Sequence, residues 1–173
     1  MMLRLIALLP FIILAAPASA QTGQTQTQVD ERFLQYLAAD SEAQIRLAQN
    51  AEKAAQSSAV VDLARLVLND TTNLKGGLGS LLEQNKITVA PQMTERVTSK
   101  VTPKTVSDFD SSFVEALINH DKNDLIRFKD EQLSTHNDEI RRFVTNAIPT
   151  LQQHVARAQD VQSSLASRST NVR

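Results

Sequence analysis

Four ionisable side chains interrupt helical stripes that are otherwise largely apolar, and their types suit metal coordination. They are Glu42, Asp70, His120 and His154. Burying such groups without partners is costly, so we expect them to contact one another, water or an ion. Two carboxylates and two imidazoles form a donor set that binds Zn, Mn or Fe. The sequence therefore predicts a buried polar or metal site at these four residues.

Asp124 is a fifth candidate for the same cluster. It follows His120 by one helical turn, on a stripe that also contains Phe113, Leu117 and Phe128. Residues four apart on a helix are neighbours, so the imidazole and the carboxylate are close enough to hydrogen-bond.

Three interpretations of the cluster remain open: a single transition metal, a di-iron centre, and a metal-free polar core. A di-iron carboxylate bundle carries a Glu three residues before a His on each of two helices. Here Leu151 stands three residues before His154, and Leu117 stands three before His120. The di-iron pattern is therefore absent. In the metal-free case each His simply pairs with a carboxylate.

Other catalytic constellations are missing from the chain. It has no Cys for thiol chemistry. The glycine-rich segment 76–80 lacks both the preceding strand and the following Lys of a phosphate-binding loop. No Ser has the surroundings of a nucleophile elbow. We assign no catalytic residue and no organic cofactor, and expect a binding protein rather than an enzyme.

Four long amphipathic segments must position the cluster. The periodicity predicts helices over 29–56, 59–84 and 108–133, and a fourth whose apolar stripe runs from Ile140 to Leu165. Four helices with one apolar stripe each favour an all-α four-helix bundle. The long connection between the second and third helices, residues 85–107, can cross the bundle from end to end.

Pro149 lies within the fourth helix, five residues before His154. A proline removes one backbone hydrogen bond and bends a helix near its own position. We expect this bend to point His154 into the bundle centre.

The first twenty residues have the pattern of a signal peptide. A short basic start precedes an apolar run, and Ala18-Ser19-Ala20 supplies the small residues of a cleavage site. A polar spacer should follow over 21–28, and the helical domain should occupy 29–168. We expect export to the periplasm, with no transmembrane segment in the mature chain.

The net charge of -1, without a basic stripe, argues against nucleic-acid binding. An envelope protein is the partner class that export suggests, and the oligomeric state stays open.

Several segments resemble a widespread bacterial family of small exported proteins, catalogued as a domain of unknown function. The segments are FLQYLAADSEAQIRLAQNA (33–51), LARLVLNDTTN (63–73), FDSSFVEALINHDKNDLIRF (109–128) and AIPTLQQHVARAQ (147–159). The resemblance implies a ferritin-like fold. It also implies that Glu42, His120 and His154 occupy family positions. Asp70 stands where the family usually has a His, which replaces an imidazole with a carboxylate.

Two functions are consistent with these observations. The first is envelope stress protection or metal handling through a buried polar or metal centre. The alternative is a non-enzymatic structural or protein-interaction module, in which the same polar groups only fix the helix register.

Overall fold

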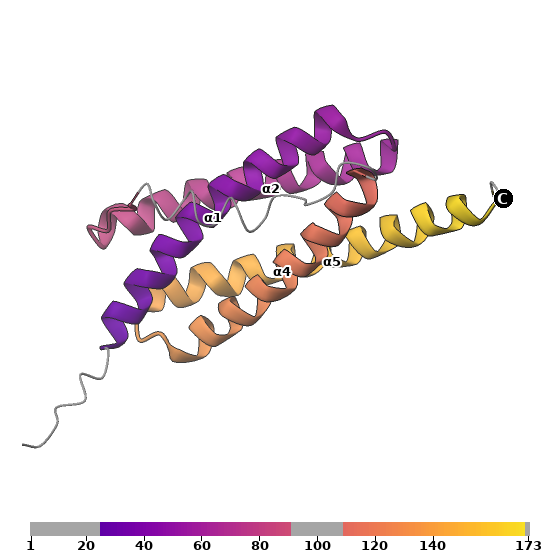
Figure 1. The fold of residues 1–173 in the computed structure, drawn as a ribbon. Helices are drawn as coiled ribbons and strands as arrows, with labels where there is room; N and C mark the ends of the chain where they lie inside the picture. Colours follow the sequence, from indigo (N-terminus) through magenta and orange to yellow (C-terminus); the bar gives the residue numbers. More distant parts are fainter. Residues whose placement is uncertain (1–24, 91–108, 172–173) are drawn as a thin grey trace, which may run out of the picture.

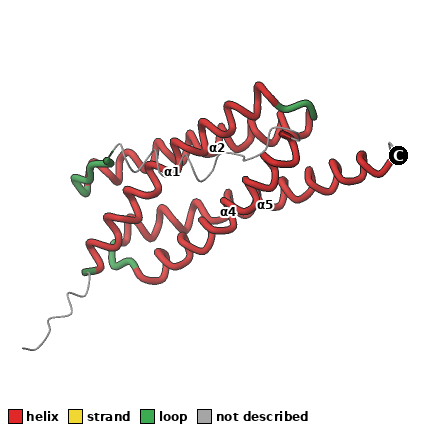
Figure 2. The backbone as a smooth tube through the Cα atoms, in the orientation of Figure 1, coloured by secondary structure: helices red, strands yellow, loops and turns green. Residues whose placement is uncertain are grey.

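The protein is a bundle of four long helices in the computed structural model, which describes residues 25–90 and 109–171. The helices are α1 (Gln26–Ala54), α2 (Ser58–Gln84), α4 (Phe109–Ser134) and α5 (Asp138–Asn171). Within the described ranges there is no strand (Figure 2). The predicted all-α four-helix bundle is confirmed, with a long connection between α2 and α4. The predicted signal peptide lies outside the described residues, as does most of that connection.

Two helical hairpins make up the bundle (Figure 1). α1 packs mainly against α2, and α4 mainly against α5. The α2–α5 contact joins the two hairpins, and a sparser contact between α1 and α4 closes the ring. A short connection joins the two helices of each hairpin: residues 55–57 between α1 and α2, and residues 135–137 between α4 and α5. The chain order around the ring is therefore α1, α2, α5, α4.

α1 begins at Gln26, three residues before the expected start at 29. The reason is a capping box at Thr25, whose hydroxyl accepts from the Gln28 backbone while the Gln28 side chain accepts from the Thr25 backbone. The last part of the predicted spacer is thus helical. At the other end α5 continues to Asn171, beyond the expected domain boundary at 168.

Pro149 lies inside α5, which continues as a helix on both sides of it. His154 is buried, with 1% of its surface exposed, as the sequence predicted. The bend expected at Pro149 stays a prediction.

The apolar core consists of two clusters separated along the bundle axis. The first is built around Leu47, Val60, Phe113 and Leu117, and the second around Leu34, Leu78, Phe128 and Ile140. On α2, α4 and α5 a short, mostly polar segment lies between the residues of the two clusters, and on α1 the polar residues Asp40, Ser41 and Gln44 follow directly after the point where the two clusters meet. The core is therefore interrupted by a polar layer near its middle.

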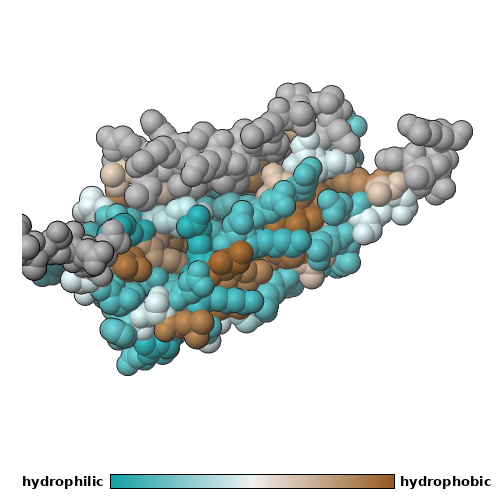
Figure 3. All heavy atoms as spheres, turned by 60° about the horizontal axis from the view of Figure 1, so that its bottom comes forward, coloured by the Kyte–Doolittle hydropathy of each residue, from teal (hydrophilic) through white to brown (hydrophobic). Residues whose placement is uncertain are grey.

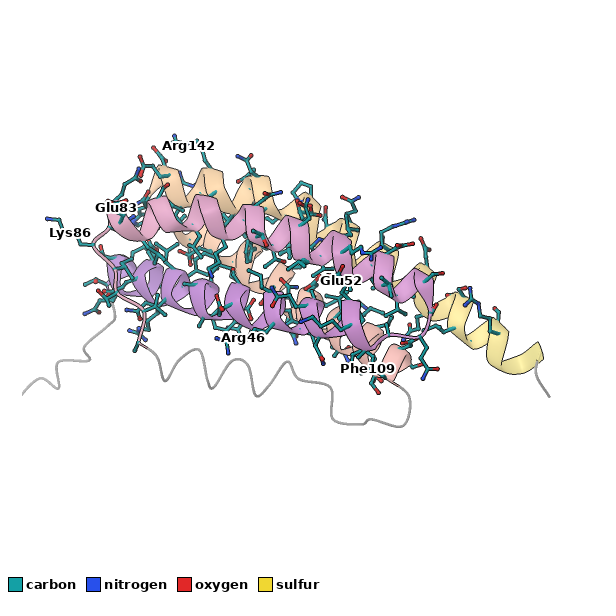
Figure 4. The ribbon with its side chains drawn as sticks, turned by 90° about the horizontal axis from the view of Figure 1, so that it is seen from above. Arg46, Glu52, Glu83, Lys86, Phe109 and Arg142 are labelled. Atoms are coloured by element: carbon teal, nitrogen blue, oxygen red, sulfur yellow. The ribbon has the colours of Figure 1, made fainter. Side chains whose placement is uncertain are left out.

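Hydrophilic residues predominate on the described part of the face drawn in Figure 3, where the hydrophobic patches are separate from one another. In Figure 4 the labelled side chains of Arg46, Lys86 and Arg142 point away from the bundle. Among the described residues, no helix combines the length and apolarity that crossing a membrane requires.

Candidate functional site

All four helices contribute side chains to the polar layer between the two apolar clusters. We define the polar layer as Asp40 and Gln44 of α1, Asp70 and Thr71 of α2, His120, Asp121 and Asp124 of α4, and His154 of α5. Each His is flanked by two carboxylates. The layer therefore divides into two histidine–carboxylate groups.

The first group, which we call the triad, consists of Asp40, His120 and Asp124 at the contact between α1 and α4. Nε2 of His120 lies 3.1 Å from Oδ2 of Asp40 and 3.2 Å from Oδ2 of Asp124. The two carboxylate side chains are 2% and 3% exposed, and the imidazole is 10% exposed. One donor atom from each residue lies within 4.8 Å of the other two. The predicted contact between His120 and Asp124 is confirmed.

Tyr36 joins the other oxygens of the same two carboxylates. Its hydroxyl lies 3.2 Å from Oδ1 of Asp40 and 3.1 Å from Oδ1 of Asp124. Burial, with the nearby charges of Asp40 and Asp124, raises the pKa of Tyr36 well above its usual value, so it stays a phenol. The guanidinium of Arg127 stacks 4.5 Å from the ring centre and covers it. Tyr36 thus holds both carboxylates in place from the side opposite His120.

The charges of the triad are tightly linked. Burial raises the pKa of Asp40 to about 7, although His120 opposes the shift. Burial favours a lower pKa for His120, but the contacts with Asp40 and Asp124 outweigh burial and raise the pKa of His120 well above its usual value. Burial favours a higher pKa for Asp124, but the hydrogen bond and the charge of His120 outweigh burial, so the pKa of Asp124 is lowered overall. Near pH 7 the His120 and Asp124 charges cancel, and ionisation of Asp40 gives the triad a net negative charge.

The second group surrounds His154. Its Nε2 lies 3.1 Å from Oδ2 of Asp70, and its Nδ1 lies 3.3 Å from Oδ2 of Asp121. The Asp121 contact has the distance of an ion pair without the geometry of a hydrogen bond. Burial lowers the pKa of His154, but the contacts with Asp121 and Asp70 outweigh it and raise the pKa. The two carboxylates therefore favour the protonated form of His154.

Gln44 connects this group to the remaining helices. Its Nε2 donates to Oδ1 of Asp121 at 2.6 Å, and its Oε1 accepts from the hydroxyl of Thr71 at 2.9 Å. Gln44, Asp121 and Thr71 are all almost fully buried. The hydrogen bonds therefore link α1, α2 and α4 across the core.

The four residues predicted as one site do not meet at one point. His120 lies in the triad, while Asp70 and His154 form the second group. Glu42 lies outside the polar layer: its side chain is 31% exposed and binds Lys75 and Arg46. Those two partners hold the pKa of Glu42 below its usual value, although burial slightly opposes them. Whether any of the four binds a metal stays a prediction.

The sequence prediction missed Asp40 because the buried face of α1 was assigned to the wrong residues. Hydrophobic spacing predicted a stripe through Leu34, Ala38 and Glu42, with Ile45, Gln49 and Glu52 nearby. Leu34 is buried as predicted, but beyond it the buried face carries Leu37, Ala39, Asp40, Ser41, Ala43, Gln44, Leu47, Ala48 and Ala51. Small and polar residues dominate this face, so hydrophobicity marks it poorly. On α4 the stripe was correct, and Asp121 lies next to it beside His120. A buried partner for each His was the signal that could have identified both residues.

The fold and the polar layer define a class of protein: a four-helix bundle whose core contains two histidine–carboxylate groups. The chain belongs to the family described as domain of unknown function DUF4142, whose model matches residues 15–161. The matched range contains α1, α2, α4 and most of α5, and so includes both groups. No curated protein and no solved structure matches the chain. The predicted membership of a family of unknown function is confirmed.

Proposed function

We propose that this protein is a metal-handling protein of the bacterial envelope, and that it binds a divalent transition metal at Asp40, His120 and Asp124. The observation that carries the proposal is the position of one imidazole nitrogen 3.1 and 3.2 Å from two carboxylate oxygens. A single ring N–H cannot donate two well-aligned hydrogen bonds. In a tetrahedral site with bonds of about 2.0–2.1 Å, neighbouring donor atoms are about 3.3–3.4 Å apart. The triad therefore needs only small adjustments to hold an ion.

The surroundings of the triad support the same proposal. Metal-binding carboxylates are usually oriented by further hydrogen bonds, and the Tyr36 hydroxyl lies within hydrogen-bond distance of the second oxygen of both Asp40 and Asp124. One nitrogen and two oxygens suit Zn, Mn or Fe. Three protein ligands leave room for water or a substrate at a further coordination position. The signal-peptide pattern of residues 1–20 supports a location in the periplasm.

Metal analysis of the mature chain, purified without a histidine tag, tests the proposal. The protein is equilibrated separately with Zn²⁺, Mn²⁺ and Fe²⁺, freed of excess metal and assayed for bound metal and for its melting temperature. We expect one ion per chain and a raised melting temperature, because an ion at about 100 times its Kd stabilises the native state by about 2.7 kcal/mol. His120→Gln and Asp124→Asn should each lower the affinity by about tenfold or more.

The matched control is His136→Gln, since His136 is exposed in the connection between α4 and α5. It should bind metal like the wild type. If no ion binds and the melting temperature is unchanged, the proposal is wrong. It is also wrong if ions bind equally well to folded His120→Gln and Asp124→Asn variants.

The alternative is a structural or interaction module with a metal-free polar layer. The hydrogen bonds of Gln44 with Asp121 and Thr71 favour it, because they fix the relative register of three helices without any ion. Buried polar groups serve this purpose in other bundles. Absence of metal binding in the experiment above would support this alternative.

A further inference from the structure

A groove on the α2–α5 side of the bundle leads from the surface to the second histidine–carboxylate group. Its outer part has a volume of about 340 Å³, and its walls include Asn73, Gly77, Phe143 and Asn146. A narrow inner part continues to Gln44, Thr71 and His154. The two parts share four lining residues, Asp70, Leu74, Ala147 and Thr150, so they lie next to each other. This is the side of the bundle away from the α1–α4 contact that holds the triad.

Asp70 places a carboxylate on the groove wall. One of its oxygens contacts Nε2 of His154, while the other, among the described residues, has only a 3.4 Å contact with the amide of Asn69. Nδ1 of His154 faces Asp121, which is completely buried. Among the described residues Asp70 is the one carboxylate on the groove wall, and 22% of its side chain is exposed. Its second oxygen is therefore open to a cationic ligand.

The remaining walls combine hydrogen-bond acceptors with an apolar surface. Asn73, Asn146 and Thr150 offer oxygen atoms near Asp70, and Leu74, Ala147 and Phe143 supply the apolar part. Gly77 lies close to Phe143: a Cβ atom there would already be in van der Waals contact with the ring, at 3.4 Å. A volume of this size is at the lower end of small-molecule sites. A bare metal ion would leave most of it unfilled.

We propose that this groove binds a small organic cation, a primary ammonium group on a short apolar chain, with the ammonium at Asp70 and the chain against Leu74 and Phe143. The three hydrogens of an ammonium group match the carboxylate and the amide and hydroxyl oxygens around it. The proposal is independent of the metal proposed at the triad, because it involves other residues on another helix pair.

The test uses the full mature chain. Two probes of similar shape, n-butylammonium and n-butanol, are titrated separately into the protein, and binding is monitored by ¹H–¹⁵N NMR. We expect saturable shifts at α2 and α5 around the groove with n-butylammonium, and an affinity for n-butanol at least about tenfold weaker. Asp70→Asn should weaken n-butylammonium binding by about tenfold or more. The control Asp62→Asn removes an equal charge from an exposed position on α2 and should bind like the wild type.

A second pair of variants tests the location without changing any charge. Gly77→Leu fills the outer groove beside Phe143 and should abolish the shifts, while Gly76→Leu lies next to open space and should leave them unchanged. Equal affinity for both probes would overturn the proposal. So would undiminished binding to folded Gly77→Leu, or n-butylammonium shifts at residues outside the groove.

Discussion

At the scale of single residues, the central feature is a set of ionisable groups that the fold buries in pairs. Asp121 is completely buried, and it has only two polar contacts in the described structure: Gln44 at 2.6 Å and His154 at 3.3 Å. A buried carboxylate without its donors would carry a large desolvation penalty. Burial already raises the pKa of Asp121 despite the opposing effect of His154. The hydrogen bond from Gln44 is therefore important to the stability of the layer.

Gln44→Leu tests that importance. The change keeps the approximate volume but leaves Oδ1 of Asp121 and the hydroxyl of Thr71 without their partner. We expect the free energy of unfolding to fall by about 2–4 kcal/mol. Urea denaturation at pH 7 gives the value. The control is Gln49→Leu, at an exposed position of the same helix, which should change stability by about 0.5 kcal/mol or less. Equal effects of the two changes would contradict this account of Gln44.

At the scale of helices, the turn between α1 and α2 is held by a residue of α4. Ser57, the N-cap of α2, makes no capping bond with its own side chain. Asp110 instead accepts hydrogen bonds from the backbone N–H groups of Gln56 at 3.0 Å and Ser57 at 2.7 Å. A carboxylate near a helix N-terminus also interacts favourably with the helix dipole. Asp110 thus joins the first hairpin to the start of the second.

Asp110→Ala should remove this connection and leave two backbone donors of the turn unpaired. We expect a loss of about 2–3 kcal/mol in the free energy of unfolding, because both bonds are charge-assisted and Asp110 is only 9% exposed. Asp130→Ala, at an exposed position of α4, is the control and should be nearly neutral. Chemical denaturation monitored by circular dichroism measures both. A loss below about 0.5 kcal/mol for Asp110→Ala would show that the bonds contribute little.

At the scale of the whole molecule, a third polar group closes the bundle at the end where α1 begins and α4 ends. Asp30 accepts hydrogen bonds from Gln26 at 2.6 Å and from the hydroxyl of Thr135 at 2.9 Å. Glu131 lies beside it, 4% exposed, and its Oε1 has no hydrogen-bond partner among the described residues. Burial raises the pKa of Glu131 to about 7, and the charge of Asp30 adds to the shift. The folded protein thus retains a proton on Glu131 that the unfolded chain releases near pH 4.5.

This proton makes stability depend on pH in a predictable direction. Between pH 4.5 and about 7 Glu131 binds more protons in the folded than in the unfolded state, so its contribution to stability falls as pH rises and levels off above about pH 7. Glu131→Gln keeps a hydrogen-bond donor toward Asp30 but cannot ionise. We expect the free energy of unfolding of this variant to decrease by about 1–2 kcal/mol less than that of the wild type as pH rises. This value is smaller than the full pKa shift implies, because Glu131 is partly solvated. Thermal and urea unfolding at pH 5, 6, 7 and 8 measure the effect.

The matched control for this pH series is Glu115→Gln, at an exposed position on α4. It should keep the wild-type slope. The Glu131 variant should also keep part of the slope, because the pKa of Asp40 is likewise raised to about 7 by burial. An unchanged slope in Glu131→Gln would show that Glu131 does not retain its proton in the folded protein.

The sequence by itself determined the helices, the bundle and the inward position of the histidines. Helix boundaries depend on local periodicity and capping, so most were predicted to within a few residues, and the contact between His120 and Asp124 follows from their spacing within one helix. The family resemblance followed from segments that can be recognised in the chain itself.

Only the tertiary structure decided which groups meet. Asp40 reaches His120 from α1 because packing sets the rotation of this helix, which periodicity does not specify when the buried face is small and polar. Asp121 lies between His154 and Gln44 because α4 packs next to both α1 and α5. That rotation turned Glu42 toward Lys75 and Arg46 on the surface. It also divided one predicted centre into two groups, since a shift of one residue moves a side chain by about 100° around a helix.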